Sequence, residues 1–127
     1  MNHQTNAAAT YRRNAVMTAS PEKLVKMLYD GAIRHMEISR TQLSSTETAQ
    51  SAIAGESLSK AIGIIGELRS SLDHEVGADI SQNLEGLYEY CLDQLSAANI
   101  QRKPQPVENS LQVIRTLKEA WDAVIPA

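Results

Sequence analysis

Apolar residues recur every three to four positions along most of this chain, which is the period of an amphipathic helix. At about 100° per residue, four segments each gather their large aliphatic side chains on one arc. The pattern predicts helices over residues 21–45, 48–74, 80–98 and 107–125. Aromatic residues are few, with no Phe, four Tyr and one Trp, and this composition favours helix packing over a sheet.

The side chains on these four arcs form the predicted core. They are Val25, Leu28, Ala32, Met36 and Leu43 in the first helix; Leu58, Ala61, Ile62, Ile65, Leu68 and Leu72 in the second; Ile80, Leu84, Leu87, Cys91, Leu95 and Ala98 in the third; and Val107, Leu111, Ile114, Leu117, Trp121 and Ile125 in the fourth. Short connections force neighbouring helices to run antiparallel. The predicted fold is therefore all-α, an antiparallel up-down four-helix bundle.

Turn-forming residues separate the predicted helices. A Ser/Thr cluster at 44–48 ends the first helix, Gly77 stops the second, and Asp79 can cap the third. Pro104 and Pro106 break the chain before the fourth helix, because neither proline supplies an N–H group.

The first residues of the chain are polar and show no apolar period, so residues 1–17 are predicted to be a mobile arm and residues 18–127 a single bundle domain. Ser20 can cap the first helix and Pro21 suits its first position. Among the apolar groups of the arm, Tyr11 and Val16 are the candidates for contact with the bundle or with a partner. Three arrangements of these two side chains are open. They are disordered, they pack on the first helix, or they lie in a groove as a lid that a partner displaces.

The charge and length of the chain narrow its possible roles. A formal net charge of −3 gives no basic field for nucleic acid or an anionic membrane surface. Apolar runs are far shorter than the roughly 20 residues of a spanning helix, so membrane insertion is not expected. Residues 1–10 lack the plan of a signal peptide, and Cys91 is the only cysteine, which rules out an internal disulfide. The protein is expected to be cytoplasmic, with Cys91 a small buried hydrophobe.

No catalytic or metal-binding pattern is found in the sequence. The carboxylate sites of ferritin-like bundles need Glu-x-x-His pairs, and none occurs. His3, His35 and His74 are not spaced as zinc ligands on one helix. The sequence therefore predicts no enzyme activity, no metal and no cofactor.

Several residues are left over once the core is filled. Met27, Gly31 and Ile38 form a second apolar strip on the outer side of the first helix. A glycine inside a helix costs about 1 kcal/mol relative to alanine, so Gly31 needs a reason such as close approach by another helix.

The other helices carry similar leftovers. Gly63, Gly66 and Gly86 lie inside predicted helices, and the apolar residues that flank the core arcs near them are Ile64, Tyr88, Leu92 and Val113. Two accounts remain open: close packing within the bundle, or outer grooves that accept amphipathic helices of a partner.

Several blocks of the sequence carry a family resemblance. They are Tyr11-Arg12-Arg13-Asn14-Ala15-Val16-Met17-Thr18-Ala19-Ser20-Pro21-Glu22-Lys23-Leu24, Met27-Leu28-Tyr29-Asp30-Gly31-Ala32-Ile33, Glu67-Leu68-Arg69-Ser70-Ser71-Leu72-Asp73, Asn83-Leu84-Glu85-Gly86-Leu87-Tyr88-Glu89-Tyr90, Ala98-Asn99 and Glu119-Ala120-Trp121. Together they span nearly the whole chain, and in them it resembles the flagellar export chaperones of the FliS type.

This resemblance implies a four-helix bundle that binds the C-terminal segment of flagellin in the cytoplasm, prevents early polymerisation and delivers its cargo to the export gate of the flagellar type III secretion apparatus. It also implies that the arm containing Tyr11 covers part of the cargo surface until displaced. The alternatives are a structural bundle that self-associates, as a homodimer for example, and a secretion chaperone for another cargo.

Overall fold

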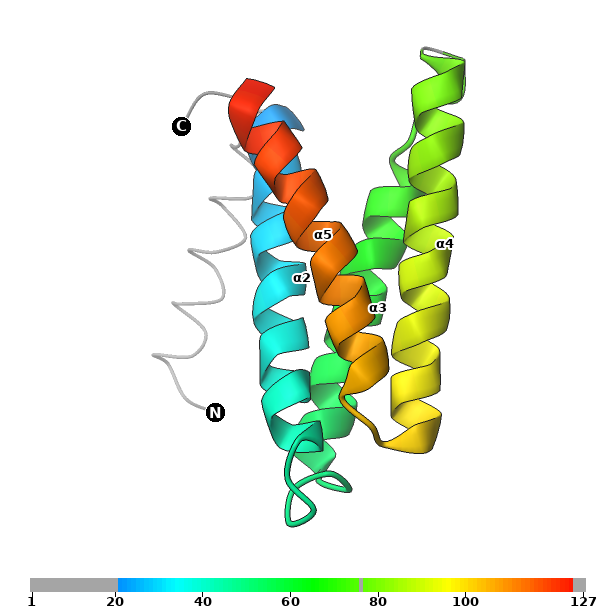
Figure 1. The fold of residues 1–127 in the computed structure, drawn as a ribbon. Coiled ribbons are helices and arrows are strands. Elements are labelled where there is room, and N and C mark those ends of the chain that lie inside the picture. Colours follow the sequence, from blue (N-terminus) through cyan, green and yellow to red (C-terminus); the bar gives the residue numbers. More distant parts are fainter. Residues whose placement is uncertain (1–20, 76, 125–127) are drawn as a thin grey trace, which may run out of the picture.

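The structure, a computed structural model, describes residues 21–75 and 77–124, and this part of the chain folds into four helices. The helices are α2 (Pro21–Leu43), α3 (Ala52–Ser70), α4 (Ala78–Gln101) and α5 (Gln105–Val124). They run alternately up and down, each packs on the next, and α5 closes the bundle against α2 (Figure 1). The predicted all-α, antiparallel up-down architecture is confirmed.

Some sequence predictions fall outside the described residues. These are the arm over residues 1–17 with Tyr11 and Val16, the Ser20 cap, and the core position of Ile125. The division into an arm and a domain stays a prediction.

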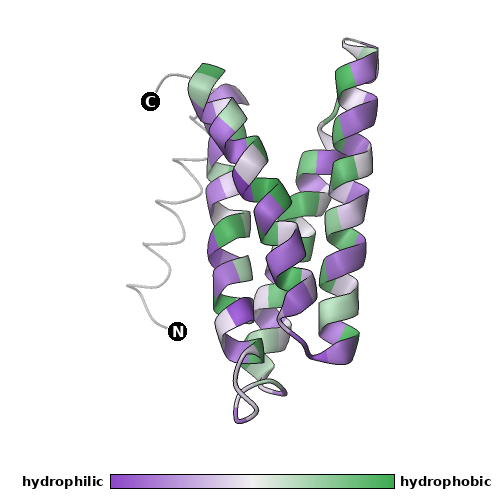
Figure 2. Ribbon diagram, in the orientation of Figure 1, coloured by the Kyte–Doolittle hydropathy of each residue, from purple (hydrophilic) through white to green (hydrophobic). Residues whose placement is uncertain are grey.

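The core lies along the bundle axis and contains mostly the residues that the helical period selects. Hydrophobic and hydrophilic positions alternate along every helix in Figure 2, as expected when each helix turns one side inward. The buried apolar side chains are Tyr29, Ala32, Met36, Leu43, Ala54, Leu58, Ala61, Ile65, Leu68, Tyr88, Cys91, Leu95, Ala98, Val107, Leu111 and Ile114. The predicted burial of Cys91 is thus confirmed.

The third predicted core face is wrong at its N-terminal end. Ile80 is 66% exposed and Leu87 is also exposed, whereas Tyr88, expected at the edge of this face, is only 2% exposed. For Ile80, Figure 1 shows the reason: α4 and α5 diverge toward the end of the bundle where α4 begins. The first turns of α4 therefore face no neighbouring helix on that side.

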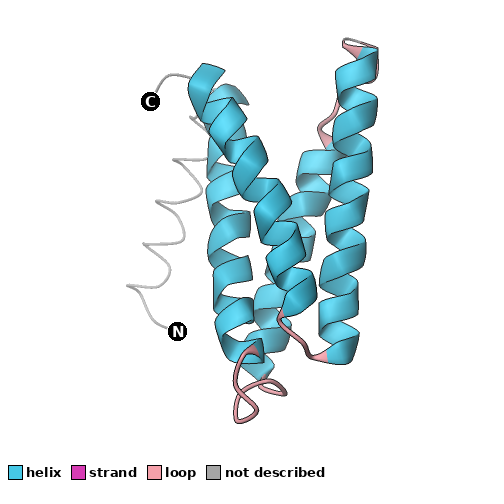
Figure 3. Cartoon of the chain, in the orientation of Figure 1, coloured by secondary structure: helices cyan, strands magenta, loops and turns pink. Residues whose placement is uncertain are grey.

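The connection between α2 and α3 is longer than predicted, because side-chain hydrogen bonds of Ser and Thr replace helical ones there (Figure 3). The Thr48 hydroxyl donates to the carbonyl of Gln42 at 2.6 Å. Ser51 is the N-cap of α3, and its hydroxyl accepts from the N–H of Ala54 at 3.1 Å. As a result α3 begins at Ala52 rather than at residue 48.

The other boundaries differ by a few residues. Gly77 is the N-cap of α4, with a left-handed φ of 65° that suits glycine, so the predicted capping by Asp79 is wrong and Asp79 lies in the first turn. Helix α5 includes Pro106, since a proline in the first turn loses no intrahelical hydrogen bond. Arg102 ends α4 in the left-handed region at φ 54°, which the sequence did not indicate.

Candidate functional site

An apolar cleft opens at the end of the bundle where α4 and α5 diverge. It has a volume of about 410 Å³ and receives residues from all four helices and from the α3–α4 connection. Its larger apolar lining residues are Val25, Leu68, Leu72, Ile80, Leu84, Tyr88 and Trp121. Val124, at the end of α5, is exposed at the same end of the bundle. The cleft is a concave apolar surface of the kind that accepts side chains of a partner.

Tyr88 lies at the floor of the cleft, and the fully buried Tyr29 lies behind it. Their hydroxyls are hydrogen-bonded to each other, and the ring centroids lie 6.5 Å apart with a tilt of 52° between the planes. Burial raises the pKa of both phenols, so both stay protonated at neutral pH. The hydrogen bond with Tyr88 opposes this rise in the pKa of Tyr29 but does not cancel it. The floor therefore carries neutral polar groups within apolar walls.

The α2–α5 wall is held together by exposed ion pairs. The ammonium of Lys26 lies 3.4 Å from Asp122, and the ammonium of Lys118 lies 2.7 Å from Asp122 and 3.5 Å from Asp30. Further along, Arg115 of α5 pairs with Glu37 of α2. These contacts join the two helices that flank one side of the cleft.

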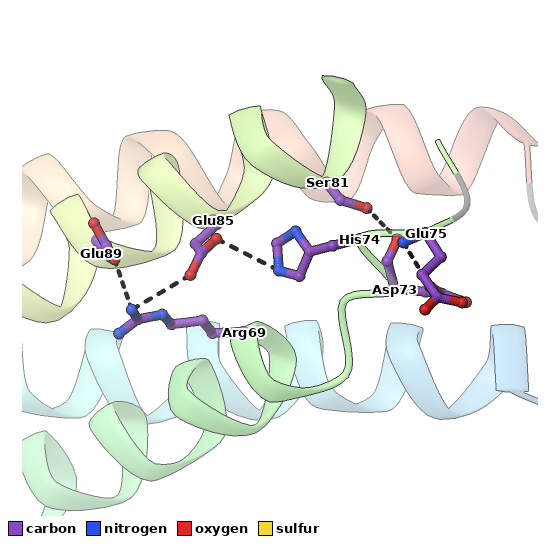
Figure 4. A network of polar contacts seen from close by, with 7 residues as sticks. All are labelled: Arg69, Asp73, His74, Glu75, Ser81, Glu85 and Glu89. Carbon is purple, nitrogen blue, oxygen red and sulfur yellow. Dashed lines mark hydrogen bonds and ion pairs between the residues drawn. The ribbon is translucent and has the colours of Figure 1, made fainter. Parts of the chain in front are cut away.

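The α3–α4 wall carries a second polar network (Figure 4). The Arg69 guanidinium lies 2.6 Å from Glu89 and 3.5 Å from Glu85, and His74 Nε2 lies 3.4 Å from Glu85. The Ser81 hydroxyl donates to the backbone carbonyl of Asp73, in the α3–α4 connection, at 2.8 Å. Exposed ion pairs of this kind contribute little to the free energy of folding, so they connect the two helices of each wall without fixing them rigidly.

The predicted strip on α2 is only partly on the surface. Met27 and Ile38 are 40% and 39% exposed, as expected of an outer strip. Gly31 faces inward to α3, because a Cβ built on it would lie 3.3 Å from Cδ1 of Ile64. Close packing within the bundle therefore explains Gly31 and Ile64 without a partner.

The remaining nominated residues are not gathered at one place. Ile64, Leu92 and Val113 are half-buried and pack against the core, and the interpretation of Tyr88 as a residue flanking the core is corrected, since it is buried and lines the cleft. Tyr11 lies outside the described residues, as does Val16.

Gly63, Gly66 and Gly86 differ from Gly31. A Cβ added at any of the three would meet nothing within 4 Å. Packing within the bundle therefore does not account for them, and the faces of α3 and α4 on which they lie are open to close approach.

Sequence reasoning missed the cleft itself. Tyr29 is buried but is absent from the predicted core, although it lies one position from Leu28 at the edge of the same arc. Trp121 was placed on a core face, and in the structure it is half-buried at the cleft. The hydrogen bond between Tyr29 and Tyr88 spans 59 residues, so no local signal in the sequence indicates it.

The described part of the chain offers no metal site, membrane span or reactive thiol. No group of three or more His, Cys, Asp or Glu side chains in it is placed to hold a metal ion. None of its helices has both the length and the apolar character needed to cross a bilayer. Burial raises the pKa of the Cys91 thiol to about 11, which disfavours the reactive thiolate.

Comparison with known proteins identifies the family. Residues 4–127 match the model of the family described as "Flagellar protein FliS". The chain is 38% identical to the flagellar secretion chaperone FliS of Vibrio cholerae over 108 residues, which are 85% of this chain and 77% of that protein. It is 39% identical to the FliS of Salmonella typhimurium over 114 residues, which are 89% of this chain and 82% of the relative. The chain therefore belongs to the FliS family of flagellar secretion chaperones, which are not enzymes.

Proposed function

We propose that this chaperone binds the C-terminal segment of flagellin partly through the apolar cleft between α4 and α5. The observation that carries the proposal is the cleft of about 410 Å³ with the exposed side chain of Ile80 at its edge. An amphipathic segment that inserts apolar side chains there removes the surface of both partners from water, which stabilises the complex.

The outer surfaces extend this proposed site. Met27 and Ile38 offer exposed apolar side chains on α2, and Gly63, Gly66 and Gly86 leave room for close approach on α3 and α4. A segment that is unstructured before binding can follow such separated patches, at the cost of the entropy lost on ordering.

The remaining elements of the proposed role concern delivery. We place the complex in the cytoplasm and expect it to pass flagellin to a component of the flagellar export gate. We also propose that the arm over residues 1–17, with Tyr11 and Val16, covers part of the cargo surface before cargo binds, as the family resemblance implies. A homodimer formed through the same apolar surfaces is the competing use of the cleft.

Calorimetric titration with a peptide spanning the C-terminal segment of the cognate flagellin tests this proposal, with circular dichroism before and after mixing. Saturable binding with added helicity is the expected result. Absence of binding together with a concentration-dependent dimer would instead assign the apolar surfaces to self-association.

A further inference from the structure

Charge is distributed unevenly along the axis of the bundle. The half that holds the cleft comprises residues 21–32, 62–75, 77–89 and 115–124, and the opposite half comprises residues 33–61 and 90–114. With histidines counted as neutral, the cleft half carries ten Asp or Glu and five Lys or Arg, a net charge of −5, whereas the opposite half carries five of each and is neutral. The net negative charge of the described residues is therefore concentrated around the cleft.

The α3–α4 connection and α4, which form one wall of the cleft, hold much of this charge. No Lys or Arg occurs between Arg69 and Arg102. Asp73 lines the cleft, Glu75 follows in the same connection, and Asp79 lies in the first turn of α4. All three carboxylates are exposed, and none has an ion-pair partner within the described part of the chain. An apolar cleft is thus bordered on this side by unpaired negative charge.

Asp73 is held at the rim of the cleft by two hydrogen bonds (Figure 4). The N–H of Glu75 donates to its carboxylate at 3.0 Å, and the Ser81 hydroxyl donates to its backbone carbonyl at 2.8 Å. A carboxylate has about four acceptor sites, so most of them remain for a cation. Because the side chain is already ordered, less conformational entropy is lost when an ion pair forms there.

We propose that the cleft selects a basic amphipathic segment of the cargo, in which Lys or Arg residues flank the apolar side chains that enter the cleft. This inference rests on the proposed function and names the chemistry of the segment that the cleft accepts. The apolar side chains fill the cleft of about 410 Å³, and the flanking cations lie against Asp73 and Asp79. An acidic segment is repelled by the same charges.

The same charges argue against a second copy of the chain as the occupant. A two-fold contact brings the same surface of both subunits together, so contact through the cleft would set one half with a net charge of −5 against another. Like charges across an interface weaken association. Cargo of opposite charge is therefore favoured over self-association at this end of the bundle.

The test is calorimetric titration of variants of the full chain with the C-terminal peptide of the cognate flagellin. Asp73→Asn combined with Asp79→Asn, the rim variant, removes two charges at the cleft and keeps the size of each side chain. Glu56→Gln combined with Glu108→Gln is the matched control, because both carboxylates are exposed in the opposite half and Glu108, like Asp79, lies in the first turn of a helix. Titrations at about 0.1 M and about 1 M salt isolate the electrostatic part, since the screening length falls from about 10 Å to about 3 Å.

A second peptide, with every Lys and Arg replaced by Gln, completes the comparison. If the rim carboxylates contact those cations, the rim variant and the altered peptide remove the same interaction, so their effects on the Kd are not additive. Thermal unfolding of both double variants reports any effect on the bundle itself.

We expect the rim variant to bind the native peptide about twofold to tenfold more weakly than the unaltered protein at low salt, the loss of one or two exposed ion pairs, and equally well at high salt. The control variant should bind within about twofold of the unaltered protein, and the altered peptide should not distinguish the rim variant from it. Equal binding of the native peptide by the rim variant and the unaltered protein at low salt overturns the inference. An equal loss in both double variants also overturns it, because only total charge would then matter.

Tighter binding by the rim variant is a third contrary result, since the carboxylates would then hold the basic arm of this chain, with Arg12 and Arg13, rather than cargo. If the unaltered protein binds neither peptide, with or without a dimer, the proposed function itself fails instead.

Discussion

Alanine in place of Gly63 or Gly86 is expected to stabilise the free bundle. Both glycines lie inside helices, α3 and α4, and a Cβ at either position meets nothing within 4 Å. The substitution therefore adds no clash, and it removes the backbone entropy cost of a helical glycine, about 0.5–1 kcal/mol at each site. The two sites lie on different helices, so the effects should add to about 1–2 kcal/mol in the double variant.

Reversible thermal and urea unfolding, followed by circular dichroism, measure this gain. For a chain of 127 residues, 1–2 kcal/mol corresponds to a rise in Tm of about 3–10 °C. Gly31→Ala is the matched contrast, because the added Cβ lies 3.3 Å from the Ile64 methyl, which has to move. It should gain less than either Gly63→Ala or Gly86→Ala.

A Tm that stays constant or falls in both Gly63→Ala and Gly86→Ala would refute the reasoning, because it would mean that these glycines serve the free fold. If the variants are stabilised and yet bind the flagellin peptide more weakly, the cost of each glycine is explained by close approach of cargo.

Three further predictions follow from single residues. Cys91, buried and with its pKa raised to about 11, should be alkylated by iodoacetamide only on unfolding, and rapid labelling of the native protein would contradict its placement. Burial lowers the pKa of His35, and the nearby cations Arg34 and Lys60 lower it further. The unfolded chain therefore takes up a proton at higher pH than the folded one, and the free energy of unfolding should fall as pH drops below 6.5. An NMR titration midpoint of His35 at or above 6.5 would disprove this. Arg102→Ala should lower the free energy of unfolding by about 1 kcal/mol, because the guanidinium donates to the backbone carbonyls of Asn99 and Ser51 at 3.0 and 3.4 Å. An unchanged midpoint of urea unfolding would count against these contacts.

The four helices could be predicted because burial of one side of a helix fixes a period that survives in the sequence. Leu58, Ala61, Ile65 and Leu68 illustrate this, since all four were selected by spacing and all are buried. The ends were less predictable, because they depend on individual side-chain hydrogen bonds such as that of Thr48 with the Gln42 carbonyl.

The cleft could not be predicted in the same way. The period places Ile80 on the core arc, but whether that arc meets a neighbour depends on how far α5 diverges from α4, which is a property of the whole packing. Likewise, Gly31 and Gly63 look alike in the sequence, and only the structure separates the one that packs on Ile64 from the one that faces open space.

The two walls of the cleft have a consequence for binding. Helices α2 and α5 are joined by the pairs Lys26–Asp122 and Lys118–Asp30, and α3 is joined to α4 by Arg69. Because these ion pairs lie within each wall and not across the cleft, a widening of the cleft by the proposed cargo segment would preserve them. Both helix pairs would then stay intact in the proposed complex.

Trp121 is the only tryptophan of the chain and it lines the cleft, so its fluorescence tests the central claim most directly. The measurement is an emission titration with a tryptophan-free peptide spanning the flagellin C-terminal segment, run beside calorimetry on the same samples. We expect a saturable shift of the emission to shorter wavelength with the same Kd as the calorimetric curve, because the peptide excludes water from the indole. Calorimetric binding that leaves the Trp121 emission unchanged would place the cargo elsewhere and contradict the assignment of the cleft.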